Sequence, residues 1–169
     1  LTTVDTVVKD FNKWFGNVND VHNKSRYLEI TVVNMSTRKR VALEDSWFDS
    51  GRFWSQPYGT FEPRSSMTFY VCNVDGGFMT GVSGGVGFRV YEGDSWVPLQ
   101  DGDLMWWICT FSSPYAGSSK CLTRWKDYGI KPLWEEMNQA HAVYDKYCAC
   151  FQKSETNMVF IWKDPETNW

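Results

Sequence analysis

The chain has 169 residues, a net charge of −3 and 43% hydrophobic residues, and 17% of all residues are aromatic. This length predicts one domain over residues 1–169 with one hydrophobic core, while the scattered basic residues argue against nucleic acid as a partner. No apolar run approaches the roughly 20 residues that a membrane-spanning helix needs, so we expect a soluble chain.

Residues 4–18, within an N-terminal region of residues 1–22, have the pattern of an amphipathic helix. Apolar side chains recur at helical spacing, with charged side chains on the other side. The apolar positions include Val4, Val7, Val8, Phe11, Trp14 and Phe15. Two interpretations remain open, a helix packed on a sheet and a segment that lies on a membrane and inserts.

Physical limits restrict how such a segment inserts. Residues 2–22 reach about 31 Å as a helix, close to the thickness of the hydrocarbon core. Four charged side chains would then cost roughly 2.5 to 3.5 kcal/mol each in lipid, more than the apolar face returns. Insertion therefore requires several helices around a water-filled lumen, and hence an oligomer.

Short strands follow, separated by polar turns. We predict strands over residues 26–34, 41–48, 67–72, 79–91 and 104–111, with an aromatic loop over residues 52–59. The fourth of these is rich in glycine, which indicates bulges or a surface that another group approaches closely. We predict a second helix over residues 130–147, with its start at residue 130 or 131. Pro132 suits the first turn of a helix, and four apolar or aromatic residues would share one helical face, namely Leu133, Met137, Ala140 and Tyr144. We therefore predict a mainly β fold, a β-sandwich over residues 26–169 flanked by two α-helices.

Several sequence stretches resemble one family of membrane toxins. The sequence GGVGFRV at residues 84–90, followed by FSSPY at residues 111–115, is similar to the central hairpin of the actinoporins, pore-forming cytolysins of sea anemones. SWFDSG at residues 46–51 and LWEEM at residues 133–137 occupy matching positions. The resemblance covers roughly residues 4–165.

The resemblance implies a secreted protein, monomeric in solution, that binds a lipid headgroup, oligomerises and inserts its N-terminal helix to form a cation-permeable pore. The headgroup would be of the phosphocholine or sphingomyelin type or another kind, and neither enzymatic activity nor a cofactor or metal is expected. The implied headgroup pocket comprises Ser50, Val86, Ser112, Pro114, Trp134 and Asn138. Phe53, Trp54 and Tyr115 are the membrane-interface residues that would replace the family's loop tryptophans if they lie on the same edge of the molecule, and the alternative for Phe53 and Trp54 is that both are core rings.

The sequence also departs from the family pattern. Asn138 and Gln139 stand where actinoporins have tyrosines, which weakens a choline site, although Trp134 can still stack on a quaternary ammonium. The loop after Pro114 is short and lacks tryptophan, and five cysteines occur where the family has none.

Alternatives follow from these departures and from local motifs. A non-lytic lectin of the fungal fruit-body type shares the fold, and free cysteines would favour an intracellular binding module. The sequence GVSGG at residues 81–85 matches a serine-hydrolase elbow, but the elbow needs a helix after the serine and here a strand is predicted. A zinc site from Cys121, His141, Cys148 and Cys150 lacks a standard ligand spacing.

Overall fold

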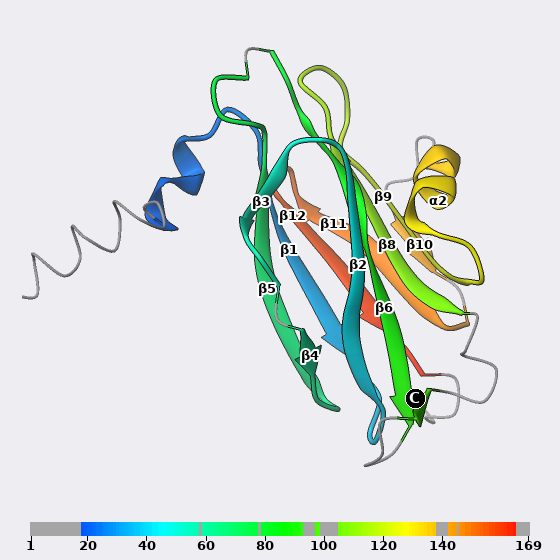
Figure 1. Cartoon of the computed structure of the whole chain (residues 1–169). Helices are drawn as coiled ribbons and strands as arrows, with labels where there is room; N and C mark the ends of the chain where they lie inside the picture. The colour runs from blue at the N-terminus through cyan, green and yellow to red at the C-terminus, as the bar shows by residue number, and fades with distance from the viewer. Residues whose placement is uncertain are drawn as a thin grey trace, which may run out of the picture.

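The computed structural model describes residues 18–57, 59–77, 79–92, 97–98, 105–137, 142–144 and 146–164. Two β-sheets pack face to face, as predicted for a β-sandwich (Figure 1). The predicted inserting positions Val4, Val7, Val8, Phe11, Trp14 and Phe15 lie outside the described residues, and so does Asn138.

The first sheet has the strand order β10-β11-β12-β1-β5-β3. Its strands, in chain order, are β1 (Tyr27–Asn34), β3 (Arg52–Ser55), β5 (Ser65–Cys72), β10 (Ala142–Tyr144), β11 (Cys148–Ser154) and β12 (Asn157–Trp162). β1 pairs in parallel with β12 and antiparallel with β5. Alternate residues of β1, namely Leu28, Ile30 and Val32, are fully buried, which is the period of a strand with one face on the core.

The second sheet has the strand order β4-β2-β6-β8-β9, with β7 paired to β6. Its strands are β2 (Arg40–Ser50), β4 (Thr60–Phe61), β6 (Val82–Glu92), β7 (Val97–Pro98), β8 (Trp106–Ser113) and β9 (Lys120–Lys126). β6 and β8 pair antiparallel, so the glycine-rich strand and the following apolar strand are neighbours at the centre of this sheet. A short 3₁₀ helix, η1 (Val18–Asn23), precedes β1.

All five predicted strands are present, whereas the long second helix is wrong. The observed helix α2 (Ile130–Glu136) ends before Met137, and the later part of the predicted range contains β10, which pairs with β11. Tyr144, expected on the buried face of a helix, is instead 70% exposed on this edge strand. Pairing with β11 therefore overrides the helical spacing.

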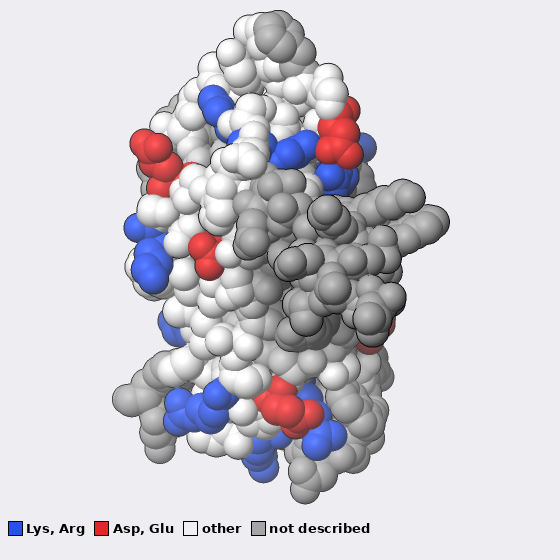
Figure 2. All heavy atoms as spheres, turned by 90° about the vertical axis from the view of Figure 1, so that its left-hand side faces the viewer, with Lys and Arg blue, Asp and Glu red and all other residues white. Residues whose placement is uncertain are grey.

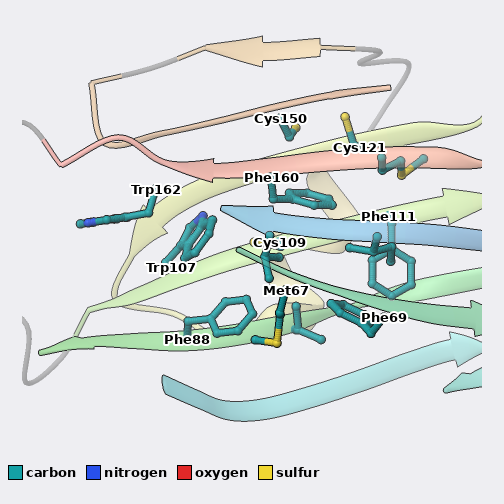
Figure 3. Packing of buried hydrophobic residues seen from close by; sticks show 14 of the residues in the cluster. Met67, Phe69, Phe88, Trp107, Cys109, Phe111, Cys121, Cys150, Phe160 and Trp162 are labelled. Carbon is teal, nitrogen blue, oxygen red and sulfur yellow. The ribbon is translucent and has the colours of Figure 1, made fainter. Parts of the chain in front are cut away.

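The core between the sheets is built largely from aromatic rings. Figure 3 shows Trp107 beside Trp162, with Phe88 on the other side of Trp107, and the ring centroids are 5.9 Å and 5.0 Å from that of Trp107. Trp107 is fully buried and donates its indole N–H to Thr123 Oγ1 at 2.9 Å, so no polar atom of this ring is left unsatisfied. Core packing therefore accounts for a good part of the aromatic content.

The five cysteines are all buried free thiols. Four of them, Cys109, Cys121, Cys148 and Cys150, belong to the sandwich core. Burial raises the pKa of the Cys109 thiol well above its usual value, and the hydrogen bond with Cys121 raises the pKa of Cys150. Since the thiolate is the reactive form, Cys109 and Cys150 act as apolar packing groups. Among the described residues, no group of three or more His, Cys, Asp or Glu side chains is placed to hold a metal ion, and His141 lies outside them.

A buried ion pair joins the turn before β2 to the segment after β12. Lys39 Nζ lies 2.6 Å from Asp164 Oδ1, with both side chains only 2% exposed, and the Ser36 hydroxyl donates to Asp164 Oδ2 at 2.8 Å. Each charge is therefore compensated in a place that water does not reach.

We predict that Lys39→Met destabilises the fold by about 3 to 5 kcal/mol, because it leaves the Asp164 carboxylate buried without its cation. Chemical denaturation monitored by circular dichroism measures the change. Glu92→Gln is the control, since it removes the exposed Arg38–Glu92 pair and should cost at most about 1 kcal/mol. Equal losses in the two variants would contradict the prediction.

Candidate functional site

The helix α2 covers the outer face of the second sheet (Figure 1). It approaches closely because β6 has glycine on that face, at Gly85 and Gly87. A Cβ at Gly85 would lie 2.6 Å from Ile130 Cγ2 and 2.8 Å from the Cys109 carbonyl oxygen, closer than real Cβ atoms come. The glycine-rich strand is thus the close-approach surface that the sequence indicates.

This close packing places Trp134 of α2 over a row of serines. Its indole N–H donates to Ser83 Oγ at 2.6 Å, and its ring meets the Trp47 ring edge-on, with 5.1 Å between centroids. Ser83 pairs in register with Ser50 of β2 and with Ser112 of β8. Paired residues on neighbouring strands point to the same face, so three hydroxyl groups line up across the sheet beside two indoles.

Four of the implied headgroup residues divide between the two faces of the second sheet. Ser50, Ser112 and Trp134 lie on this outer face around Ser83. Val86 does not, because its side chain is fully buried on the opposite face, in the sandwich core. Ser83, which the headgroup assignment missed, is the hydrogen-bonded centre of the group. The elbow motif around it is absent, since Ser83 lies inside β6 rather than on a turn before a helix.

The implied membrane-interface residues separate into three environments. Phe53 is partly buried and packs against the core, 4.9 Å from Phe48 and 5.9 Å from Phe69 between ring centroids, which favours the core interpretation of this ring. Trp54 is half-buried, with the Arg52 guanidinium 5.4 Å from its ring centroid. Tyr115 is 41% exposed, on the loop after β8.

Tyr115 belongs to one end of the sandwich, which we call the loop end: the β2–β3 turn, the β5–β6 loop and the β8–β9 loop. Figure 1 shows these connections together at the top of the view. Val74 and Met79, on the β5–β6 loop, are 41% and 55% exposed. Neither residue was predicted to be functional, although isolated apolar residues in the glycine-rich stretch at residues 73–81 were an available signal.

The Asp75 carboxylate of the β5–β6 loop forms ion pairs with two basic side chains. Asp75 Oδ1 lies 2.7 Å from Lys24 Nζ and 2.9 Å from Arg52 Nη2, and these hydrogen bonds, that of Lys24 foremost, lower the pKa of Asp75 to about 2. These two ion pairs tie the β5–β6 loop to η1–β1 and to β3, while the Asp75 side chain, like Val74 and Met79, stays exposed.

A polar pocket of about 510 Å³ opens beside the β8–β9 loop. Its walls are residues 25–27, parts of the segment 113–119, and Gln152, Glu155 and Thr156 around the β11–β12 turn. Pro114 lines this pocket, whereas Ser50, Ser112 and Trp134 do not. The volume is in the range of small-molecule sites.

Acidic and basic residues are interspersed on the described part of the face shown in Figure 2. This face thus carries no broad basic patch of the kind that binds nucleic acid. No helix among the described residues has the length and apolar character required to cross a bilayer.

Solved structures are similar to this one at low sequence identity. The crystal structure of Nakanori, a lipid binding protein, is similar with a TM-score of 0.63 and 10% identity, covering 91% of this chain and 78% of that one. RahU, solved in complex with a TRIS molecule, has a TM-score of 0.50 and 10% identity over 85% of this chain and 98% of its own. IP-1A from Alcaligenes faecalis has a TM-score of 0.45 and 15% identity over 84% and 94%. No protein-family model and no curated protein matches the chain by sequence.

We predict that Gly85→Ala destabilises the protein by about 1 to 3 kcal/mol, because the added methyl group forces Ile130 away from β6. Equilibrium unfolding measures the loss, and tryptophan fluorescence reports the displacement of Trp134. Gly59→Ala is the matched control, since a Cβ there would meet nothing within 4 Å. A Gly85 variant as stable as the Gly59 variant would contradict the close approach.

Proposed function

We propose that this protein binds membrane lipid through its loop end and, as actinoporins do, then assembles into a pore lined by its N-terminal amphipathic segment. The observation that carries the first step is the grouping of Val74, Met79 and Tyr115, all exposed, on two loops at one end of the sandwich. Apolar and aromatic side chains in such a group gain free energy when they enter the interfacial region of a bilayer.

The arrangement of the charged side chains also supports an orientation in which the loop end faces the membrane. Arg26 lies beneath Tyr115, with 5.2 Å from its guanidinium carbon to the ring centroid, and Lys24 and Arg52 lie beneath the β5–β6 loop. Tyr115 is also suited to the boundary between water and lipid because its ring is apolar and its hydroxyl is polar. A further argument is the likeness of the fold to that of a lipid binding protein.

The serine row and Trp134 are the proposed contact for a lipid headgroup. Hydroxyl groups at Ser50 and Ser112 can donate to phosphate oxygens, and the Trp134 ring can stack on a quaternary ammonium. Trp134 is only partly buried, and its hydrogen bond to Ser83 fixes the ring orientation. A phosphocholine-type headgroup fits these groups, although the family's tyrosines are missing.

Pore formation is the second proposed step and depends on residues 4–18. A single copy of this segment carries charges that oppose insertion, whereas a ring of copies keeps them in a water-filled lumen. The protein is proposed to be secreted as a monomer and to oligomerise only on the membrane. The lectin alternative has no use for this amphipathic segment, which is why we place it second.

We predict that the double substitution Met79→Ser and Tyr115→Ser weakens binding to sphingomyelin-containing vesicles by roughly ten- to a hundredfold, because two apolar anchors are removed. Co-sedimentation with vesicles measures the affinity. Tyr144→Ser is the control, since that ring is 70% exposed on β10, away from the loop end. Unchanged binding in the double variant would reject the loop end as the docking surface.

We predict that Val8→Asp abolishes dye release from the same vesicles while binding persists, because a charge enters the apolar side of the segment. Lys13→Gln, on the polar side, should retain release. Release that survives Val8→Asp would remove this segment from the pore. Clumping of red cells that sugar inhibits, without lysis by the unaltered protein, would favour the lectin instead.

A further inference from the structure

We propose that the polar pocket beside the β8–β9 loop binds a neutral, hydroxyl-rich ring, that is, a sugar or an inositol. The pocket is separate from the serine row and Trp134, and nothing in the proposed phosphocholine contact uses it. Its volume of about 510 Å³ suits a group of this size.

The three walls of the pocket are held together by internal hydrogen bonds. Arg26 donates from Nε to the Pro114 carbonyl at 3.2 Å and from Nη2 to the Tyr115 carbonyl at 2.5 Å, which ties the first wall to the β8–β9 loop. The Glu29 N–H donates to the Thr156 carbonyl at 2.7 Å, which ties β1 to the β11–β12 turn. The pocket is therefore formed before any ligand arrives, which lowers the entropic cost of binding.

The charges in the pocket argue against an anionic ligand. Each nitrogen of Arg26 already donates to a backbone carbonyl, the remaining one from Nη1 to the Ser25 carbonyl at 2.7 Å. Three of the five N–H donors of the guanidinium are thus used by backbone carbonyls, which fixes its position, and Glu155 gives the lining a net charge of zero. Glu155 is the acidic residue of the lining, it has no ion-pair partner among the described residues, and its carboxylate would repel a second negative charge.

The other lining groups suit hydroxyls. Ser118 and Ser119 can both donate and accept, Gln152 offers an amide that does the same, and the Glu155 carboxylate accepts. Tyr27 adds a ring to the first wall. The site thus offers several neutral groups that donate and accept hydrogen bonds, and one carboxylate that accepts. This set of groups suits a polyol better than a choline or a phosphate.

The position of the pocket suggests where such a ring comes from. Pro114 lines the pocket and Tyr115, the next residue, is exposed at the loop end. If the loop end docks on a bilayer, as proposed above, the pocket faces the headgroup layer and the ligand is the sugar of a glycolipid. This choice of source rests on the proposed function, whereas the recognition of a polyol does not.

Titration of the full-length protein with free galactose, glucose, N-acetylglucosamine and myo-inositol, followed by ligand-observed NMR, tests the pocket itself. We expect saturable binding of at least one of them, and a loss of tenfold or more in affinity with Gln152→Leu or Ser119→Val. Ser66→Val, an exposed serine on β5, is the control and should bind normally. No saturable signal with any of the four, or equal signals in the pocket variants and the control, would overturn the proposal, and so would inorganic phosphate that displaces the sugar at equal concentration.

Vesicles distinguish the source of the ring and separate the two proposals. Stronger co-sedimentation with phosphatidylcholine vesicles containing galactosylceramide than with phosphatidylcholine alone, lost in Gln152→Leu, supports a glycolipid. Binding of free sugar without any vesicle binding supports the pocket for a soluble saccharide and rejects lipid docking. Vesicle binding that is unaffected by Gln152→Leu and by the four free ligands supports docking and rejects the pocket.

Discussion

The contact between Ile130 and the bare backbone of Gly85 governs the outer face of the second sheet. Only a strand without side chains at this point lets α2 lie against β6 and β8. The helix α2 has only 7 residues and no side-chain cap at its N-terminus. Its packing on β6, rather than helix propensity, therefore keeps it folded. The glycines of β6 would ordinarily weaken a strand, and here that cost is offset by the burial of Ile130 and Leu133.

The same contact brings Trp134 next to the serine row. Because α2 lies so close, Trp134 reaches Ser83, and the serine row lies beside the indole rings of Trp134 and Trp47. At the loop end, Arg26 fixes a second contact. Its hydrogen bonds to the carbonyls of Pro114 and Tyr115 join the segment before β1 to the β8–β9 loop. The described sandwich thus carries a serine row beside Trp134 and a separate polar pocket near the exposed apolar loops.

The sandwich was predictable because alternation and turn residues are local signals. The strands at residues 26–34 and 67–72 show that alternation clearly, and they pair with each other as β1 and β5. The helix at residues 130–147 was overextended because Met137 and Tyr144 keep helical spacing, while the pairing of β10 with β11 is a tertiary effect that spacing does not encode. Val86 was misplaced for a similar reason. A position matched to a family motif does not reveal which face of a strand it occupies, and a one-residue offset reverses that face.

The place of β12 in the first sheet has a consequence for how this protein is made. β12 inserts between β1 and β11, so the earliest described strand acquires its parallel neighbour only after residue 162 has left the ribosome. Until then β1, rich in valine and isoleucine, has an open edge of the kind on which other chains aggregate. Completion of the sheet therefore falls late in translation, and nascent chains that stop before residue 157 are the form most in need of a chaperone.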